Sequence, residues 1–347
     1  MDPLSFFEAA HEAYRQAERA AGGPAERSLR VAGHTVHLRF AGPVLVRPMT
    51  RAFAHLVSGP AVEPGLTVHL WDSVSTGVPM PPPPWGSGAY GARGEVVSFL
   101  NERIHITYNV LACSLSLIDL ERGLALYWIP ETDPFPMSES AGPLRTVLYR
   151  WMRSRGLYLV HAAAVGRPDG GVLIAGRSGS GKSTVALACA GSRIGYAGDD
   201  HCLLEAGLSP SVYGVYATGR HHPVDAPRFP RLARYAGTIP PGEKALYFMN
   251  EIFPDKVLRS FPLRSVLVPR WAKGPGSSIH PAPRGAALRA LAPSTLFQMP
   301  GAGTEDFGAL AATVREAGAF YLDIGSDLEA LPDLIAGHLD APAGAFR

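Results

Sequence analysis

Cysteine, charged residues and long hydrophobic runs are all scarce in this sequence. Its 347 residues include three cysteines, Cys113, Cys189 and Cys202, which lie far apart and lack the spacing of a metal site. We therefore expect small buried thiol side chains in a protein of a reducing compartment. No stretch of about 18 uncharged apolar residues occurs, so no membrane-spanning segment is expected.

A run or block of one charge is also missing. Charged residues make up 18% of the chain, and the formal net charge is +2. This pattern excludes an extended basic surface of the kind that binds nucleic acid. The N-terminal segment lacks the long apolar core of a signal peptide. We expect a cytoplasmic protein without nucleic-acid or membrane partners.

Apolar and turn-forming residues, by contrast, are plentiful. Hydrophobic residues make up 46% of the chain, and its 38 glycines and 32 prolines indicate many turns. The length predicts about two domains, and the expected fold class is α/β (α+β). We expect a β-rich α+β domain in residues 1–130, a linker and helix in 131–156, and a second domain in 157–347.

The first domain is predicted from alternating apolar and polar residues, which are typical of half-buried strands. The sequence shows no catalytic constellation in it. The expected elements are a helix over 3–21, a short helix over 50–57, an exposed proline-rich loop over 79–84, and strands over 28–31, 34–40, 66–71, 94–101, 103–108, 114–120 and 124–129. A proline-bearing linker over 130–143 and a helix over 144–155 follow.

The second domain is expected to begin with a hairpin. A turn too short for a crossover helix joins the strand 157–165 to the strand 171–176, so the two should pair antiparallel. Further predictions are strands over 193–200, 245–249, 264–269 and 320–324, helices over 286–291, 304–317 and 327–339, and a turn-rich stretch over 219–242.

The segment 176–184 is the most informative motif. It matches G-x-x-x-x-G-K-[ST] at every fixed position and lies between an expected strand and an expected helix over 185–190. Backbone amides of such a loop bind phosphate oxygens, the lysine adds a positive charge, and the following hydroxyl binds Mg²⁺. The motif predicts that ATP and Mg²⁺ are bound by Gly176, Arg177, Ser178, Gly179, Ser180, Gly181, Lys182, Ser183 and Thr184.

Two carboxylates, Asp199 and Asp200, follow the next expected strand. Phosphoryl transfer needs positioned phosphates, a metal and a group that orients the nucleophile. Adjacent strand residues point to opposite sides, so one aspartate can bind the metal while the other contacts the acceptor. We place both in the catalytic set with Lys182 and expect Ser183 and Asp200 to hold the metal. Which aspartate is the base stays open, and a solvated turn pair is the alternative.

Four other polar residues are candidates for the site. His161 lies in an apolar run beside the expected loop strand, so it is either a satisfied core residue or a catalytic one. Arg220 and His222 lie in the turn-rich stretch, where they either bind phosphate or acceptor or belong to a polar loop. Lys244 precedes the strand 245–249 and is a further candidate for contact with the nucleotide.

In combination, these motifs resemble the catalytic domain of HPr kinase/phosphorylase, whose fold is similar to that of phosphoenolpyruvate carboxykinase. The matching features are a strand with His161, a hairpin, the loop 176–183, and a strand that ends in Asp199-Asp200. The resemblance covers residues 157–205. It implies that an aspartate of the pair acts as base toward a protein serine, or as acid in the reverse reaction.

The whole chain looks similar to HPr-kinase-related proteins of gene clusters for peptide natural products. The shared features are the β-rich first half, His-Ala-Ala-Ala-Val165, Leu-Ala-Pro-Ser-Thr295 and Leu322-Asp-Ile-Gly325. Thr184 stands where HPr kinase has an acidic residue, so HPr is not the expected acceptor. Some of those relatives phosphorylate a serine of a lasso-peptide precursor, and the resemblance implies an acceptor of that kind.

We therefore expect an ATP- and Mg²⁺-dependent serine kinase that acts on a peptide or protein. The first domain would recognise the acceptor or mediate assembly, and the resemblance is compatible with a homo-oligomer. Two alternatives stay open: a small-molecule kinase with a closed acceptor pocket, and a regulatory protein that binds ATP without transferring phosphate. The sequence determines neither the acceptor nor the number of phosphates nor the preference between ATP and GTP.

Overall fold

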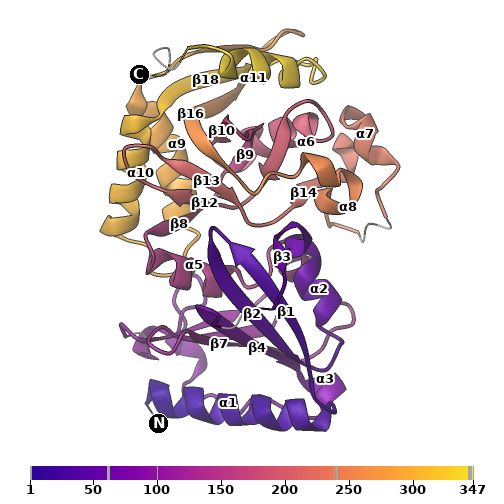
Figure 1. Ribbon diagram of the computed structural model, residues 1–347, viewed down its shortest axis with the longest axis vertical. Coiled ribbons are helices and arrows are strands. Elements are labelled where there is room, and N and C mark those ends of the chain that lie inside the picture. The colour runs from indigo at the N-terminus through magenta and orange to yellow at the C-terminus, as the bar shows by residue number, and fades with distance from the viewer. Residues whose placement is uncertain are drawn as a thin grey trace. The chain divides into compact units, whose positions relative to one another are not determined.

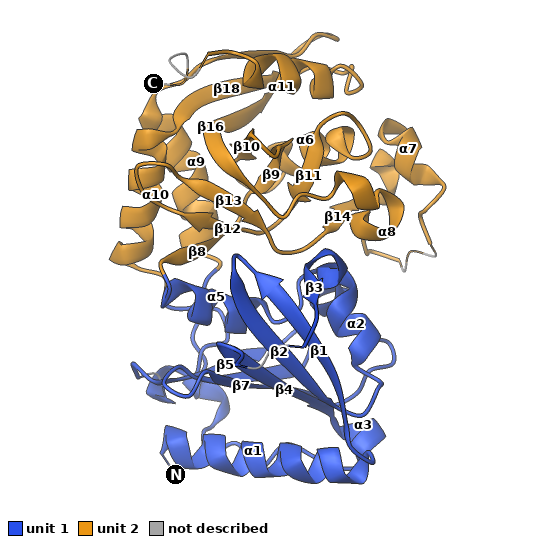
Figure 2. Cartoon of the chain, in the orientation of Figure 1, with its two compact units in different colours: residues 1–155, 299–301 blue, residues 156–298, 302–347 orange. Residues whose placement is uncertain are grey.

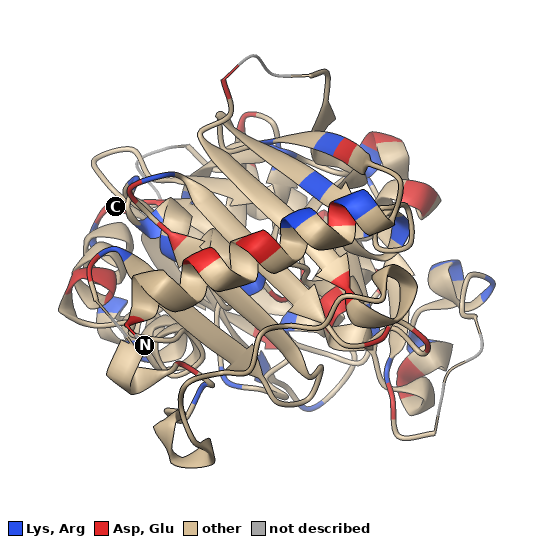
Figure 3. Cartoon of the chain, turned by 90° about the horizontal axis from the view of Figure 1, so that it is seen from below, with Lys and Arg blue, Asp and Glu red and all other residues tan. Residues whose placement is uncertain are grey.

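The computed structural model describes residues 2–60, 63–99, 101–237, 239, 241–342 and 346. These residues form two compact units, each a mixture of helices and strands (Figure 1, Figure 2). Unit 1 contains residues 1–155 and 299–301, and unit 2 contains residues 156–298 and 302–347. No described helix is long and apolar enough to cross a membrane. Basic and acidic residues are interspersed along the described elements (Figure 3).

Unit 1 is built on one sheet. Its strands are β1 (Pro24–Val31), β2 (His34–Ala41), β3 (Val57–Ser58), β4 (Leu66–Asp72), β5 (Ile104–Asn109), β6 (Ser114–Asp119) and β7 (Leu124–Ile129). They lie in the order β3-β1-β2-β4-β7-β6-β5, with β4 parallel to both of its neighbours. The helices are α1 (Pro3–Ala20), α2 (Val46–Thr50), α3 (Ser73–Thr76), α4 (Met137–Ala141) and α5 (Arg145–Arg153), with 3₁₀ helices η1 (Arg51–Leu56), η2 (Ser87–Ala89) and η3 (Val97–Phe99).

Helix α1 packs against the sheet of unit 1 (Figure 1). It begins after Asp2, whose carboxylate accepts a hydrogen bond of 3.0 Å from the backbone amide of Ser5. Its buried side chains recur at helical spacing and join Trp71 and Leu126 of the sheet in one apolar cluster. These side chains are Phe6, Phe7, Ala10, Ala13, Tyr14 and Ala17.

Most expected elements of unit 1 are confirmed, but the strand expected over 94–101 is wrong. A tight turn over 91–94 folds the chain back, with the Gly91 amide donating to the Glu95 carbonyl. Only isolated pairs remain, Glu95 with Thr107 and Val96 with Tyr90, and the chain continues into η3. Residue 100 lies outside the described residues.

Two further expectations in unit 1 need correction. The helix expected over 50–57 begins earlier, as α2, and continues as η1, whose three-residue turn buries Phe53 and Leu56 on one side. The expected linker over 130–143 contains α4, and both α4 and α5 belong to unit 1. Residues 299–301 also belong to unit 1, where the Met299 carbonyl accepts a hydrogen bond of 3.2 Å from Arg93.

Unit 2 carries the loop 176–184. Its strands are β8 (Leu157–Val160), β9 (Ala163–Arg167), β10 (Gly170–Ile174), β11 (Gly195–Gly198), β12 (Cys202–Glu205), β13 (Ser211–Gly214), β14 (Thr218–His221), β15 (Ala245–Phe248), β16 (Ser260–Trp271), β17 (Ser278–Pro281) and β18 (Gly318–Ile324). Nine of them form a sheet in the order β11-β9-β10-β16-β13-β12-β8, with β18 on β16 and β17 on β18, while β14 pairs with β15.

The helices of unit 2 cover both faces of this sheet. They are α6 (Lys182–Cys189), α7 (Pro230–Ala233), α8 (Met249–Ile252), α9 (Arg284–Leu296), α10 (Thr304–Glu316) and α11 (Leu331–Leu339), with η4 (Pro223–Arg228) and η5 (Pro254–Lys256). Alternate residues of β10 point to opposite faces. Val172 and Ile174 pack with α6 and α11, whereas Leu173 packs with α9 and α10. The strand before the loop is therefore buried on both faces.

The expected hairpin is confirmed, because β9 and β10 pair antiparallel. The single strand expected over 157–165 is wrong, since the chain breaks at His161 and Ala162 into β8 and β9. β8 pairs with β12 instead. At the break, the His161 amide donates to the Thr295 hydroxyl at 3.2 Å, so a side chain of α9 replaces a strand partner. His161 thus lies between two strands and not within one.

The rest of unit 2 follows the prediction with shifted boundaries. The strands expected over 193–200, 245–249, 264–269 and 320–324 correspond to β11, β15, β16 and β18, and the helices to α9, α10 and α11. Helix α9 extends beyond its expected range at both ends, and α11 begins at Leu331. The stretch 219–242, expected to consist of turns, holds the end of β14, η4 and α7.

Candidate active site

The loop between β10 and α6 has the backbone that a phosphate-binding loop requires. Gly179 and Gly181 have φ angles of +78° and +109°, values that side-chain-bearing residues rarely adopt. A Cβ atom on Gly181 would lie 2.6 Å from the Ile324 side chain of β18. The glycines thus let the loop turn tightly between β18 and the first turn of α6.

Lys182 is the first residue of α6, and its side chain folds back over the loop. Its Nζ donates to the carbonyl oxygens of Gly176 at 2.7 Å and Arg177 at 3.3 Å. The residue is 6% exposed. Burial lowers the pKa of Lys182, while the charges of Asp200 and Asp199 act in the opposite direction. The hydrogen-bond partners of this ammonium are neutral carbonyl oxygens, which leaves its charge available to an anionic ligand.

Asp199 and Asp200 follow β11, as expected, and their environments differ. Asp199 is 3% exposed, and its Oδ2 accepts a hydrogen bond of 3.0 Å from the backbone amide of Arg220. Its Oδ1 is buried and has no hydrogen-bond partner among the described residues. Burial and the charge of Asp200 raise the pKa of Asp199, against the opposing effect of the Ser183 hydroxyl. Asp199 is thus an enclosed carboxyl, one oxygen of which has no hydrogen-bond partner among the described residues.

Asp200 reaches the cavity beside the loop. Its Oδ1 lies 2.8 Å from His161 Nε2, and its Oδ2 accepts a hydrogen bond of 2.5 Å from the guanidinium of Arg220. Burial acts to raise the pKa of Asp200, but the nearby His201, His161 and Arg220 hold it well below its usual range. These partners favour the ionised form of Asp200, and its side chain stays 35% exposed.

His161 is oriented from its other ring nitrogen. The amide Nε2 of Gln298 lies 2.8 Å from His161 Nδ1, and an amide nitrogen can only donate. In this arrangement a neutral ring accepts at Nδ1 from Gln298 and donates from Nε2 to Asp200. The row Gln298–His161–Asp200 gives His161 a specific partner on each side.

These residues line one cavity of about 300 Å³ in unit 2. The loop and α6 contribute Gly179, Lys182 and Ser183. His161, at the break between β8 and β9, and Asp200, which follows β11, also line it. Other lining residues come from the segment 220–229, from Lys244 and from Trp271. The lining includes four lysine or arginine side chains and two carboxylates, so the cavity favours an anionic ligand.

The structure brings most of the expected site residues together. Arg220, His222 and Lys244 line the cavity, together with Ser178 and Thr184 of the loop. Gly176 and Arg177 contribute carbonyl oxygens that accept hydrogen bonds from Lys182. The Ser180 hydroxyl is buried without a hydrogen-bond partner among the described residues. Asp199 is enclosed.

The adjacent histidines do not form a metal pair. His221 Nδ1 lies 2.7 Å from the carbonyl of His222, and its Nε2 lies 2.9 Å from the Tyr247 hydroxyl. Both ring nitrogens of His221 are therefore engaged within the protein. No group of three or more His, Cys, Asp or Glu that could hold a metal is found within the described part of the chain.

Gln298 and Trp271 are site residues that the sequence analysis missed. Gln298 is separated from His161 by 137 positions, and Trp271 Nε1 donates to the carbonyl of Gly179, 92 positions away, at 3.3 Å. Neither residue belongs to a local motif. Only the packing of α9 and the end of β16 beside the loop reveals them.

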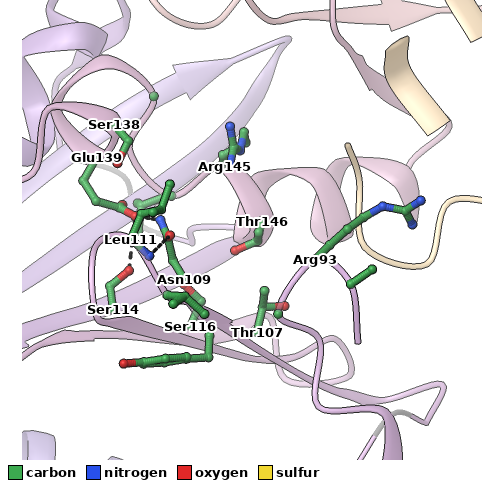
Figure 4. A pocket seen from close by; sticks show the side chains of 16 residues that line it. Arg93, Thr107, Asn109, Leu111, Ser114, Ser116, Ser138, Glu139, Arg145 and Thr146 are labelled. Carbon is green, nitrogen blue, oxygen red and sulfur yellow. Dashed lines mark hydrogen bonds between the residues drawn. The ribbon is translucent and has the colours of Figure 1, made fainter. Parts of the chain in front are cut away.

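Unit 1 holds a separate cavity of about 210 Å³ (Figure 4). On one side of it Glu139 of α4 accepts hydrogen bonds from Asn109 Nδ2 at 2.7 Å and from the Ser114 hydroxyl at 3.1 Å. Burial raises the pKa of Glu139, although both hydrogen bonds oppose the shift. This carboxyl thus ties α4 to the hairpin of β5 and β6.

Comparisons with known proteins give structural likenesses but no sequence match. No protein-family model matches this sequence, and no curated protein matches it. The solved structure of the HPr(Ser) kinase/phosphatase from Coxiella burnetii is similar over 52% of this chain and 95% of that chain, with 12% identity and a TM-score of 0.30. At this TM-score we draw no conclusion from the likeness about fold or activity.

Proposed function

We propose that this chain is an ATP- and Mg²⁺-dependent phosphotransferase that phosphorylates a serine of a peptide or protein. The observation that carries the proposal is the position of Asp200, held by His161 and Arg220, in the cavity that Lys182 also lines. Nucleotide phosphates and an acceptor hydroxyl need such neighbouring sites for direct transfer. A purely nucleotide-sensing protein needs no carboxylate oriented toward an acceptor.

The phosphates would bind the loop and the ammonium of Lys182. In the structure this ammonium contacts two neutral carbonyls, which phosphate oxygens of higher charge would outcompete. Arg220, Lys244 and the backbone amides at the start of α6 add positive potential around the same cavity.

The residues present also fit Mg²⁺. The buried Oδ1 of Asp199, which has no hydrogen-bond partner among the described residues, is a hard oxygen donor, and the Ser183 hydroxyl is close enough to lower the pKa of the same carboxyl. Mg²⁺ is usually held by one or two carboxylates and by substrate phosphates, where it neutralises charge that develops during transfer. These contacts favour Asp199 over Asp200 as the carboxylate that holds the metal with Ser183.

Asp200 would then face the acceptor. Its two oxygens are held by His161 and Arg220, and its exposed side can accept a hydrogen bond from a serine hydroxyl. The hydroxyl oxygen bonds to the γ-phosphorus, the bond to the bridging oxygen breaks, and ADP leaves. Asp200 takes the hydroxyl proton and releases it to water. Its lowered pKa suits orientation of the hydroxyl more than early proton removal.

The acceptor class is the part of the proposal that rests on the family resemblance. We propose a ribosomally made peptide, such as a lasso-peptide precursor, as the acceptor. Unit 1 would recognise the acceptor or mediate assembly of a homo-oligomer.

The proposal is tested by mass spectrometry. The purified chain is incubated with Mg-ATP and the precursor peptide encoded nearest its gene. We expect one or more phosphates on a peptide serine, and a rate lower by roughly 10²- to 10⁴-fold in Asp200→Asn. Lys182→Ala should lose transfer through lost ATP binding. Asp333→Asn, in an exposed ion pair with Arg193, is the matched control and should keep the wild-type rate. Bound ATP without any phosphorylated peptide would contradict the proposal.

A further inference from the structure

Trp271 is an exposed tryptophan beside the loop 176–184. It ends β16, is 49% exposed and lines the nucleotide cavity. Trp71 and Trp151 of the same chain are fully buried. Leaving so much apolar surface in water is unfavourable, so an exposed indole inside a cavity points to a ligand that covers it.

The indole is held in a fixed relation to the loop. Its Nε1 donates to the carbonyl of Gly179 at 3.3 Å. The orientation of the ring is therefore linked to the same loop that would hold the phosphates. The distance between the indole and the loop is therefore set before a ligand binds to them.

Arg228 of η4 lies over one face of the Trp271 ring. Its guanidinium carbon lies 4.9 Å from the ring centroid, and Arg228 also lines the cavity. Its ion pair with Asp225 is long, at 3.5 Å, and both side chains are partly exposed. The guanidinium can therefore be displaced from the ring at low cost.

We infer that Trp271 and Arg228 form the binding site for the nucleobase of the nucleotide. The base stacks on the face of Trp271 that Arg228 covers, and the planar guanidinium moves to the edge or outer face of the base. This inference rests on the proposed function. Stacking accepts any base with a large π-face, so the site binds ATP and GTP with similar affinity and pyrimidine nucleotides more weakly.

Calorimetric binding of Mg-ATP and of magnesium tripolyphosphate, which lacks base and ribose, separates stacking from phosphate binding. Trp271→Leu should weaken ATP binding by about 5- to 100-fold and change tripolyphosphate binding less than twofold. Trp271→Phe should lose less, and Arg228→Gln should also affect ATP alone. Unchanged tripolyphosphate binding shows that the loop of the variant is intact.

Tryptophan fluorescence gives a second readout. ATP should quench the emission of the wild type and of the control variant Trp128→Phe, but tripolyphosphate should not. Trp271→Phe should lose the quench. Equal effects of Trp271→Leu on ATP and tripolyphosphate, or none on either, would overturn the base site alone. Failure of the wild type to bind ATP would overturn the proposed function and the base site together.

Discussion

Arg220 illustrates how one residue organises two neighbouring carboxyls in different ways. Its backbone amide donates to Asp199, and its guanidinium binds Asp200. The contact with Asp199 leaves one buried oxygen of that carboxyl without a hydrogen-bond partner among the described residues. The contact with Asp200 helps to lower the pKa of a carboxyl that lines the cavity. Two adjacent residues of the same type thus differ in pKa because their hydrogen-bond partners differ.

Gln298 gives a prediction at the same scale. Gln298→Leu removes the donor to His161 Nδ1, so His161 no longer has a fixed tautomer for its hydrogen bond to Asp200. We expect kcat to fall by roughly 10- to 100-fold with KM for ATP within twofold, as for other residues that position a functional group. Steady-state kinetics of peptide phosphorylation measure both values.

The Gln298 prediction has a distinguishing control. Gln298→Glu places a carboxylate beside His161 Nδ1 and favours the protonated ring, so the pH profile of kcat should change shape. A purely structural role of Gln298 would give unfolding or a changed KM, with the pH profile of kcat left as in the wild type.

At the scale of elements, hydrogen bonds from side chains decide where segments end and what they contact. β8 and β9 are separated at His161, whose backbone amide donates a hydrogen bond to the Thr295 hydroxyl of α9 and not to a neighbouring strand. Helix α4 is only five residues long, too short to be stable by itself, and Glu139 connects it to Asn109 and Ser114 of the neighbouring hairpin.

Glu139 makes the stability of unit 1 dependent on pH. Because its pKa is raised in the fold, the stability it contributes is present below its ordinary value of 4.5 and is lost as the pH rises through the folded value. Glu139→Gln stays neutral and keeps an acceptor for Asn109 and Ser114. We expect equal melting temperatures near pH 4 and a variant that melts a few degrees higher at pH 7.

Thermal unfolding across this pH range measures the Glu139 effect. The exposed Glu102 supplies the matched control, since Glu102→Gln should follow the wild type at every pH. A Glu139→Gln variant less stable than the wild type at pH 7 would show that the charged form is the favoured one in the fold.

At the scale of the whole molecule, the chain forms two units with separate apolar clusters. The cavity beside the loop 176–184 is lined by residues of unit 2 alone, and the second cavity by residues of unit 1 alone. Ligand binding to the native cavity should therefore act on the unfolding of unit 2.

This arrangement predicts a ligand-dependent stability. At 100 times its dissociation constant, Mg-ATP should stabilise unit 2 by about 2.7 kcal/mol, seen as a raised melting temperature in scanning calorimetry. EDTA should remove most of the shift if Asp199 and Ser183 hold Mg²⁺. Lys182→Ala should show no shift, and an equal shift in that variant would mean that ATP binds elsewhere.

Several local features of this protein follow from the sequence by itself. The loop 176–184, the strand before it, the helix after it and the position of Asp199 and Asp200 behind a strand are all local patterns, and the structure has them. The hairpin of β9 and β10 follows from the short turn between them. Such features depend on residues within a few positions of one another, where backbone geometry and residue type suffice.

Only the tertiary structure decided which distant side chains line the cavity or contact the residues that line it. Gln298 and Trp271 come from positions far along the chain, and the break at His161 depends on Thr295 of α9. The sequence likewise left open which aspartate lines the cavity, because alternation along a strand does not say on which side the cavity lies. These contacts depend on how distant elements pack, and no local pattern encodes that.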